Sequence, residues 1–94
     1  MKWMISVPMR NRKNSEIRKD ILRAKKKIRL YDKDAVILTP ILVKYFRPLD
    51  GLAKGISDMA QVDAVFFCDN CMEYRGCLVE CIIAKLYEKR VYFE

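Results

Sequence analysis

Short apolar runs alternate with longer segments of mixed polarity along the chain, and this pattern predicts a β-α-β-α-β-α-β order. A continuous apolar run is typical of a strand buried within a sheet, and proline ends such a run because it cannot donate to the strand ladder. Pro8 follows the first run and Pro40 the second, which we expect to be covered on both faces. The sequence therefore predicts four strands, over residues 2–7, 35–39, 64–67 and 91–93.

Between these runs, apolar side chains recur at helical spacing. The first helix follows a cap at Asn14 or Ser15, and its apolar face consists of Ile17, Ile21, Ala24 and Ile28. A second, shorter helix is weakened by Gly55, and its apolar positions are Leu52, Ile56, Met59 and Ala60. A third helix opens at Gly76, with four side chains able to face the core: Val79, Ile82, Ile83 and Leu86. We expect residues 41–50 and 69–74 to form loops.

Alternating strands and helices with short connections favour a parallel sheet with right-handed crossovers. Residues 1–94 therefore make a single domain, which we predict to be a small flavodoxin-like (Rossmann-like) three-layer α/β fold with strand order 2-1-3-4. Ligands of such sheets bind beyond the carboxyl ends of the strands, near the point where the strand order reverses. Three segments are expected to meet there: residues 8–10, the loop after Thr39, and residues 69–76.

The formal net charge of +7 is concentrated in residues 10–29, which contain ten basic and two acidic side chains. Such a stripe is commonly a solvated helix face. Binding of nucleic acid phosphates is a less favoured alternative, because no aromatic side chains lie among these charges to stack on bases. The chain has no histidine, which excludes Ser-His-Asp triads and metal–imidazole sites. No apolar run reaches the roughly 20 residues that span a bilayer, so we expect no membrane association and a cytoplasmic location.

The four cysteines have the spacing C-x2-C-x5-C-x3-C, over Cys68, Cys71, Cys77 and Cys81. Four thiolates could close a tetrahedral zinc site, and Cys68 with Cys71 could form a redox pair. Against zinc, Cys68 ends a buried strand and the gap between the two pairs is short for a zinc finger. The redox pair would follow an inner strand, away from the helix start that stabilises a thiolate. We favour reduced cysteines packed as small apolar side chains, with no metal and no cofactor.

Two segments carry candidate chemistry. Gly76 allows close approach of a ligand to a helix N-terminus, and Glu80 lies about one turn further on, with its side chain leaning back toward that end. A carboxylate there could attack the anomeric carbon of a sugar, although an acidic residue near a helix start also simply complements the helix dipole. Ser6 and Arg10 flank the end of the first strand, where a hydroxyl and a guanidinium suit phosphate or sugar oxygens.

Three blocks of sequence resemble one family. Residues 6–10 resemble the Ser-x-Pro-Met-Arg opening of small phage and bacterial proteins in the nucleoside 2-deoxyribosyltransferase-like superfamily. Residues 48–49, 52, 54 and 62–66 are similar to the segment before and along the third strand of those proteins, and residues 75–80 to their Arg-Gly-Cys-x-x-Glu signature. The resemblance implies a homodimer or larger homo-oligomer that cleaves or transfers N-glycosidic bonds, with Glu80 as nucleophile. We expect the substrate-binding positions to be Ser6, Pro8, Met9, Arg10, Glu73, Arg75 and Gly76.

The chain departs from this family at two positions. Active relatives carry an aspartate early in the second helix that assists departure of the base, and this chain has Gly55 there. Arg75 stands where they place an acidic residue, although Glu73 could supply a proton and Arg75 could hold a phosphate. The sequence thus leaves two functions open: an N-glycosidic hydrolase or deoxyribosyltransferase acting on a nucleoside or nucleoside 5′-monophosphate, or a catalytically inactive protein that senses or sequesters a nucleotide.

Overall fold

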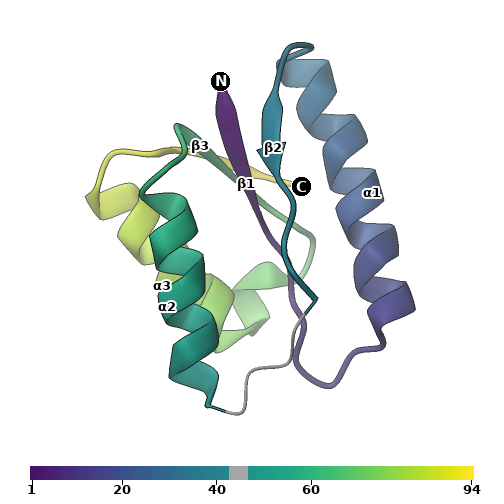
Figure 1. Ribbon diagram of the computed structural model, residues 1–94, viewed down its shortest axis with the longest axis vertical. Coiled ribbons are helices and arrows are strands. Elements are labelled where there is room, and N and C mark those ends of the chain that lie inside the picture. Colours follow the sequence, from purple (N-terminus) through teal and green to yellow (C-terminus); the bar gives the residue numbers. More distant parts are fainter. Residues whose placement is uncertain (43–46) are drawn as a thin grey trace.

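Four parallel strands in the order β2-β1-β3-β4 form the centre of the protein, in a computed structural model that describes residues 1–42 and 47–94 (Figure 1). The elements in chain order are β1 (Lys2–Ser6), α1 (Asn14–Tyr31), β2 (Val36–Leu38), α2 (Pro48–Met59), β3 (Ala64–Phe67), the 3-10 helix η1 (Cys71–Glu73), α3 (Arg75–Leu86) and β4 (Arg90–Phe93). The predicted α/β class, the parallel sheet and its strand order are confirmed.

The helices make two layers on either side of this sheet, with α1 covering one face and α2 and α3 covering the other (Figure 1). Alternation along β1 decides which side chains meet which layer, because successive strand residues point to opposite faces. Trp3 and Ile5 pack in the core beneath α1, whereas Met4 packs beneath α2 and α3. Ser6 follows Met4 in this alternation and also faces the α2 and α3 side.

Helix α1 buries the four side chains that the periodicity predicts, Ile17, Ile21, Ala24 and Ile28. Its predicted cap is wrong: Lys13 is the extended residue before the helix, and Asn14 and Ser15 lie within the first turn. No side chain caps this end by a hydrogen bond. The helix is therefore held by its buried apolar stripe more than by its terminus.

Two expectations about exposure and boundaries are corrected. The second strand is not covered on both faces, because β2 is an edge strand whose Val36 is exposed. Residues 48–50 belong to α2 and not to a loop, since Pro48 occupies the first turn, where a helix needs no amide hydrogen from it. Residues 43–46 of the predicted 41–50 loop lie outside the described residues. The loop expected over residues 69–74 contains η1.

The side chains with which α3 faces the sheet match only part of the expected set, of which Ile83 packs against the core as predicted. Ile82 and Leu86 are exposed, and the buried positions are Cys77, Cys81 and Ala84. Both sets have helical spacing, so periodicity alone does not choose between them. Small cysteine and alanine side chains let α3 approach the sheet closely, and cysteine behaves there as a compact apolar residue. Ala60, expected on the apolar face of the second helix, follows α2 as its exposed C-cap.

Candidate functional site

A buried serine and a glutamate meet at the carboxyl end of β1. Ser6 is the last residue of β1 and is 2% exposed, and its Oγ donates a hydrogen bond of 2.7 Å to Oε1 of Glu80. Glu80 lies in the second turn of α3, and helical side chains lean toward the N-terminus, which brings this carboxylate to the end of the strand. The two residues come from separate predicted blocks, and the fold places them in direct contact.

Gly55 of α2 lies against the same carboxylate. A Cβ atom at position 55 would be 2.0 Å from Oε2 of Glu80 and 3.2 Å from its Cδ. The carboxylate therefore occupies the space that any side chain at this position would need. A side chain at position 55 would therefore displace the Glu80 carboxylate from its present place.

The environment of Glu80 raises the pKa of its carboxyl group. Burial raises the pKa of this carboxyl because it removes water from the charged form, and the hydrogen bond from Ser6 acts in the opposite direction. The negative charge of Asp58, on α2, adds to the increase. A carboxyl group whose pKa is raised by burial can carry a proton near neutral pH or, when ionised, act as a reactive base or nucleophile.

Two thiols share the same small space. The Sγ of Cys71 donates to the backbone oxygen of Ser6 over 3.3 Å and lies 3.4 Å from the Ser6 Oγ. Hydrogen bonds from Cys71 and Ser6 lower the pKa of Cys77, whereas the contact with Cys77 and burial raise the pKa of Cys71. All four cysteines are free and buried, and the described part of the chain contains no group of three metal-ligating side chains suited to a metal ion.

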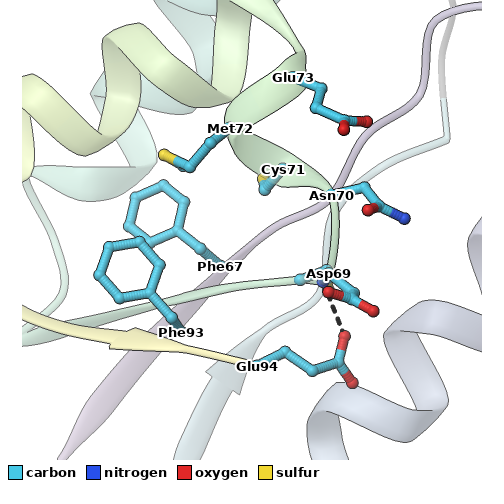
Figure 2. Close-up of a pocket in the computed structure, with 9 residues that line it drawn as sticks. Phe67, Asp69, Asn70, Cys71, Met72, Glu73, Phe93 and Glu94 are labelled. Atoms are coloured by element: carbon cyan, nitrogen blue, oxygen red, sulfur yellow. Dashed lines mark hydrogen bonds between the residues drawn. The ribbon is translucent and has the colours of Figure 1, made fainter.

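An open hollow of about 280 Å³ lies at the carboxyl ends of β3 and β4. Figure 2 shows the rings of Phe67 and Phe93 near Met72, whereas the side chains of Asn70 and Glu73 point away from these rings. The two rings stack with their centroids 5.6 Å apart. A lining that includes both aromatic and polar residues is common in small-molecule sites.

Cys71 connects this hollow to the Ser6–Glu80 pair, because it lines the hollow while its thiol contacts Ser6. Neither Ser6 nor Glu80 is part of the lining. The hollow and the carboxylate are therefore neighbouring features on the two sides of Cys71.

The other positions expected to bind substrate lie at different places. Pro8 is buried and its carbonyl accepts a hydrogen bond from Arg12, and Met9 packs against the core beneath α1. Glu73 lines the hollow. Three further positions are exposed and do not line it: Arg10, and the first two residues of α3, Arg75 and Gly76. A Cβ atom on Gly76 would meet nothing within 4 Å, so packing within the chain does not require glycine there.

Cys71 and Cys77 are reduced and buried as the sequence predicts, but sequence reasoning missed their place beside the Ser6–Glu80 pair and the packing role of Gly55. Cys77 could have been found, because it lies three residues before Glu80 and residues at this spacing share a helix face. Cys71 and Gly55 carry no local signal. Their contacts depend on how η1 and α2 pack beside α3, which no spacing within one element reveals.

No protein-family model, curated protein or solved structure matches this chain. Its class follows from its own architecture: a small parallel α/β domain of the flavodoxin-like type, with a serine-held carboxylate at the carboxyl edge of the sheet. Within residues 1–42 and 47–94, every helix is too short or too polar to cross a bilayer.

Proposed function

We propose that this protein is an N-glycosidic bond hydrolase or deoxyribosyltransferase that acts on a nucleoside or nucleoside 5′-monophosphate, with Glu80 as the nucleophile. The observation that carries the proposal is the 2.7 Å hydrogen bond from the buried Ser6 to Glu80 at the carboxyl end of β1. Parallel α/β sheets bind ligands at this edge. The sequence motifs that supply both residues support the same reaction.

In the proposed reaction, the Glu80 carboxylate attacks the anomeric carbon through an oxocarbenium-like transition state. The bond from carbon to the base nitrogen breaks, the bond from carbon to the carboxylate oxygen forms, and the base leaves with a proton. Water then displaces the carboxylate in a hydrolase, and a second base does so in a transferase. The hydrogen bond from Ser6 fixes the direction of the carboxylate, and such fixed geometry lowers the barrier by avoiding reorientation.

The remaining roles extend this proposal. Glu73, at the rim of the hollow, is the candidate proton donor to the departing base. The loop of Pro8, Met9 and Arg10 and the start of α3 at Arg75 and Gly76 would hold the sugar and phosphate. Two guanidinium groups favour a 5′-monophosphate over a bare nucleoside, because they form paired hydrogen bonds with phosphate oxygens.

The test is incubation of the full chain with ribo- and deoxyribonucleosides and their 5′-monophosphates, with released base measured by chromatography. We expect release from at least one substrate and a loss of at least about a thousandfold in Glu80→Gln, as for removal of a nucleophile. Glu16→Gln is the matched control, because Glu16 is an exposed glutamate on α1. Equal release by wild type and Glu80→Gln would refute the assignment.

A nucleotide-binding protein without turnover is the second candidate, and Gly55 is the observation that favours it. The aspartate that assists base departure in the resembling enzymes has no equivalent at this position, where Glu80 fills the space. This candidate predicts that one nucleotide raises the melting temperature of wild type and Glu80→Gln by the same amount. It also predicts no base release by either.

We further propose that the protein works in the cytoplasm as a homodimer or higher homo-oligomer. Three exposed apolar side chains form a row along α3, at i, i+4 and i+8: Leu78, Ile82 and Leu86. A second subunit covering this row would bury apolar area that is otherwise solvated. The four free cysteines suit a reducing compartment. Nucleic acid bound on α1 remains the less favoured partner. Its affinity would fall steeply as the salt concentration rises.

A further inference from the structure

The outer side of β4 pairs with no other strand within residues 1–42 and 47–94, because β4 is an edge of the sheet. The amides of Arg90 and Glu94 donate inward, over 3.1 and 2.9 Å, to carbonyl oxygens just before and within β3. Backbone groups alternate in direction along a strand, so the N–H and C=O groups of Val91 and Phe93 point to the outer edge. Such an edge is a template for pairing with another strand.

The opposite edge of the sheet is less suited to pairing. Strand β2 contains only Val36–Leu38, and Pro40 follows it closely. Short strands and prolines are features that discourage edge-to-edge association. Strand β4 contains no proline, and its half-exposed Phe93 adds apolar surface at the edge. We therefore expect a partner strand at β4.

We propose that two copies of this chain join through their β4 strands, which pair antiparallel about a two-fold axis at Tyr92 and make one continuous sheet across the dimer. In this register Val91 lies opposite Phe93 of the partner subunit, and residues opposed in this way exchange two backbone hydrogen bonds. Both outward-facing residues of each strand are then paired. The interface rests on the homo-oligomer of the proposed function and does not depend on the N-glycosidic reaction.

The same register also brings together three favourable side-chain pairs: Tyr92 with the partner's Tyr92, Val91 with the partner's Phe93, and Arg90 with the partner's Glu94. Aromatic pairs, aromatic side chains beside β-branched ones, and opposite charges are the cross-strand pairs that stabilise sheets. Arg90 is exposed, and its guanidinium donates to the sulfur of Met1 over 3.6 Å, which is a weak acceptor. The edge is therefore complementary to itself, as a two-fold interface requires.

A second open hollow, of about 360 Å³, lies beside this edge on the α1 face. Its lining comes from α1, β3 and the end of β4: Lys27, Leu30, Tyr31, Phe66, Phe93 and Glu94. Leu30 and Tyr31 are largely exposed there. Arg90 has the same strand parity as Tyr92, which packs on the α1 face, so Arg90 of the partner subunit would enter this hollow opposite Glu94. Its aliphatic stem can cover the apolar lining while its charge stays near the carboxylate.

The exposed apolar row of α3 faces the same end of the sheet. Glu80 points toward α2, and Leu78 and Ile82 each lie two residues from it, which is a rotation of about 200° on a helix. The row therefore points away from α2. Helix α2 contacts β1, whereas α3 contacts β3 and β4, so this direction leads toward the β4 edge. A two-fold axis normal to the sheet keeps both α3 helices on one side, where each can cover the row of the other.

The experiment places a cysteine on the proposed axis. In the antiparallel register the two Tyr92 residues form a pair whose Cα atoms lie about 4.5 Å apart, which a disulfide can bridge. We expect Tyr92→Cys to give a covalent dimer on a non-reducing gel after treatment with copper phenanthroline, and dithiothreitol to reverse it. Wild type should give none, because its four cysteines are buried.

Two matched controls test the register and the surface. Phe93→Cys lies on the same strand, but the two copies of residue 93 would be diagonal neighbours more than about 7 Å apart, beyond the reach of a disulfide. Leu22→Cys is exposed on α1. We expect neither variant to cross-link. Circular dichroism confirms that each variant is folded.

A charge reversal tests the same interface without touching the aromatic packing of Tyr92. Arg90→Glu places like charges opposite each other at two symmetric positions, and we expect the dimer dissociation constant to rise by about tenfold. Arg29→Glu is the matched control, because it makes the same charge change at an exposed position of α1. Size exclusion with light scattering over a range of concentrations measures both constants.

The outcomes separate this interface from the rest of the proposed function. An oligomer in which Tyr92→Cys folds without cross-linking, in which Phe93→Cys cross-links equally well, or in which Arg90→Glu and Arg29→Glu dissociate alike, would overturn the β4 pairing and leave the homo-oligomer standing. A chain that is monomeric at every concentration would overturn both. Base release is measured separately, so its absence refutes the proposed reaction and leaves the interface intact.

Discussion

The two faces of the sheet bury different kinds of side chain, although the same four strands contribute to both faces. Beneath α1 the core is built mainly from aromatic and β-branched side chains, with Trp3, Phe66 and Ile28 fully buried. Beneath α2 and α3 the core contains Met4, Met59 and three of the four cysteines. Ser6, a buried polar residue, and its partner Glu80 lie on this second face.

Because of this difference, we expect the α1 face to contribute most to folding stability and the α2 and α3 face to hold the reactive groups. Large rigid side chains fill the α1 face, where the buried indole N–H of Trp3 donates to Asp32, so its contribution to folding is mostly apolar burial. The α2 and α3 face uses small and polarisable side chains that let helices approach closely, and it accommodates a carboxylate against Gly55. If the two faces are independent, a substitution on one face should leave the property carried by the other face unchanged.

The largest effect is expected on the α1 face. Ile28→Ala removes a fully buried side chain, and we expect the free energy of unfolding to fall by about 3 kcal/mol, as for other large-to-small core changes. Urea melts followed by circular dichroism measure this. Base release per folded molecule should stay at the wild-type rate, and a parallel loss of specific activity would show that the two faces are coupled. Leu22→Ala, at an exposed position of the same helix, is the control.

On the α2 and α3 face we expect the opposite pattern, in which a substitution lowers activity and leaves stability intact. Gly55→Ala should leave stability unchanged or raise it by up to about 1 kcal/mol, because alanine is the better helix residue. Only the flexible end of Glu80 has to move, since the new Cβ would lie 2.0 Å from its Oε2. We expect base release to fall by about 100-fold, as for other small displacements of reacting groups.

Ser57→Ala is the matched control for Gly55→Ala, because Ser57 is exposed on the same helix. Carbon-detected NMR of the Glu80 carboxyl provides a readout that does not require activity. Its pKa should change in Gly55→Ala and remain raised in the control. An unchanged Glu80 signal in Gly55→Ala would contradict the packing role assigned to the glycine.

The fold could be predicted from the sequence because its signals are local. The apolar stripe of α1 and the strand at residues 64–67 depend on spacing within one element, and the β-α alternation restricts the topology to few choices. The face of α3 could not be predicted in the same way. Ile82 and Cys81 each belong to a set of apolar residues at helical spacing. The space available between α3 and the sheet decides which of the two sets is buried.

The candidate site was predictable only where a motif supplied it. Ser6 and Glu80 were both named from sequence blocks, and the structure adds that they touch. Gly55 was interpreted as the loss of an aspartate, whereas the structure shows a position that Glu80 requires to be empty. Such contacts between α2 and α3 depend on interaxial distance, which sequence periodicity does not contain.

Glu94 provides a third test, because its side chain links α1 to the backbone just after β3. Its side chain is 4% exposed and accepts hydrogen bonds from Arg23 Nε at 2.5 Å and from the Asp69 amide at 2.8 Å, with Lys27 Nζ at 3.0 Å. Glu94→Gln should lower the free energy of unfolding by about 2 kcal/mol, the usual cost of losing hydrogen bonds to a charged group. Thermal melts at neutral pH measure it.

The same contacts set a pH dependence opposite to that of Glu80. Hydrogen bonds from Arg23 lower the pKa of Glu94 from 4.5 to about 2, so its contribution to stability is present above pH 4.5 and is lost as pH falls toward 2. The pKa of Glu80 is raised, so ionising this carboxyl costs stability as pH rises above 4.5. Acid melts of Glu94→Gln should therefore be flatter than those of wild type between pH 4.5 and 2. Identical acid sensitivity would contradict this assignment.

The smallest effect on the folded subunit is expected from Ile82→Lys, which tests what covers the outside of α3. Ile82 is 50% exposed at the centre of the apolar row, so the substitution should change the stability of the isolated subunit by no more than about 0.5 kcal/mol. If a second subunit packs on this row, burying an unpaired lysine there is unfavourable, and light scattering after size exclusion should show a shift toward monomer. Leu22→Lys, on the exposed side of α1, should leave the assembly unchanged. An oligomer that survives Ile82→Lys and dissociates in Leu22→Lys would place the subunit contact on the α1 face and remove the α3 row from the proposal.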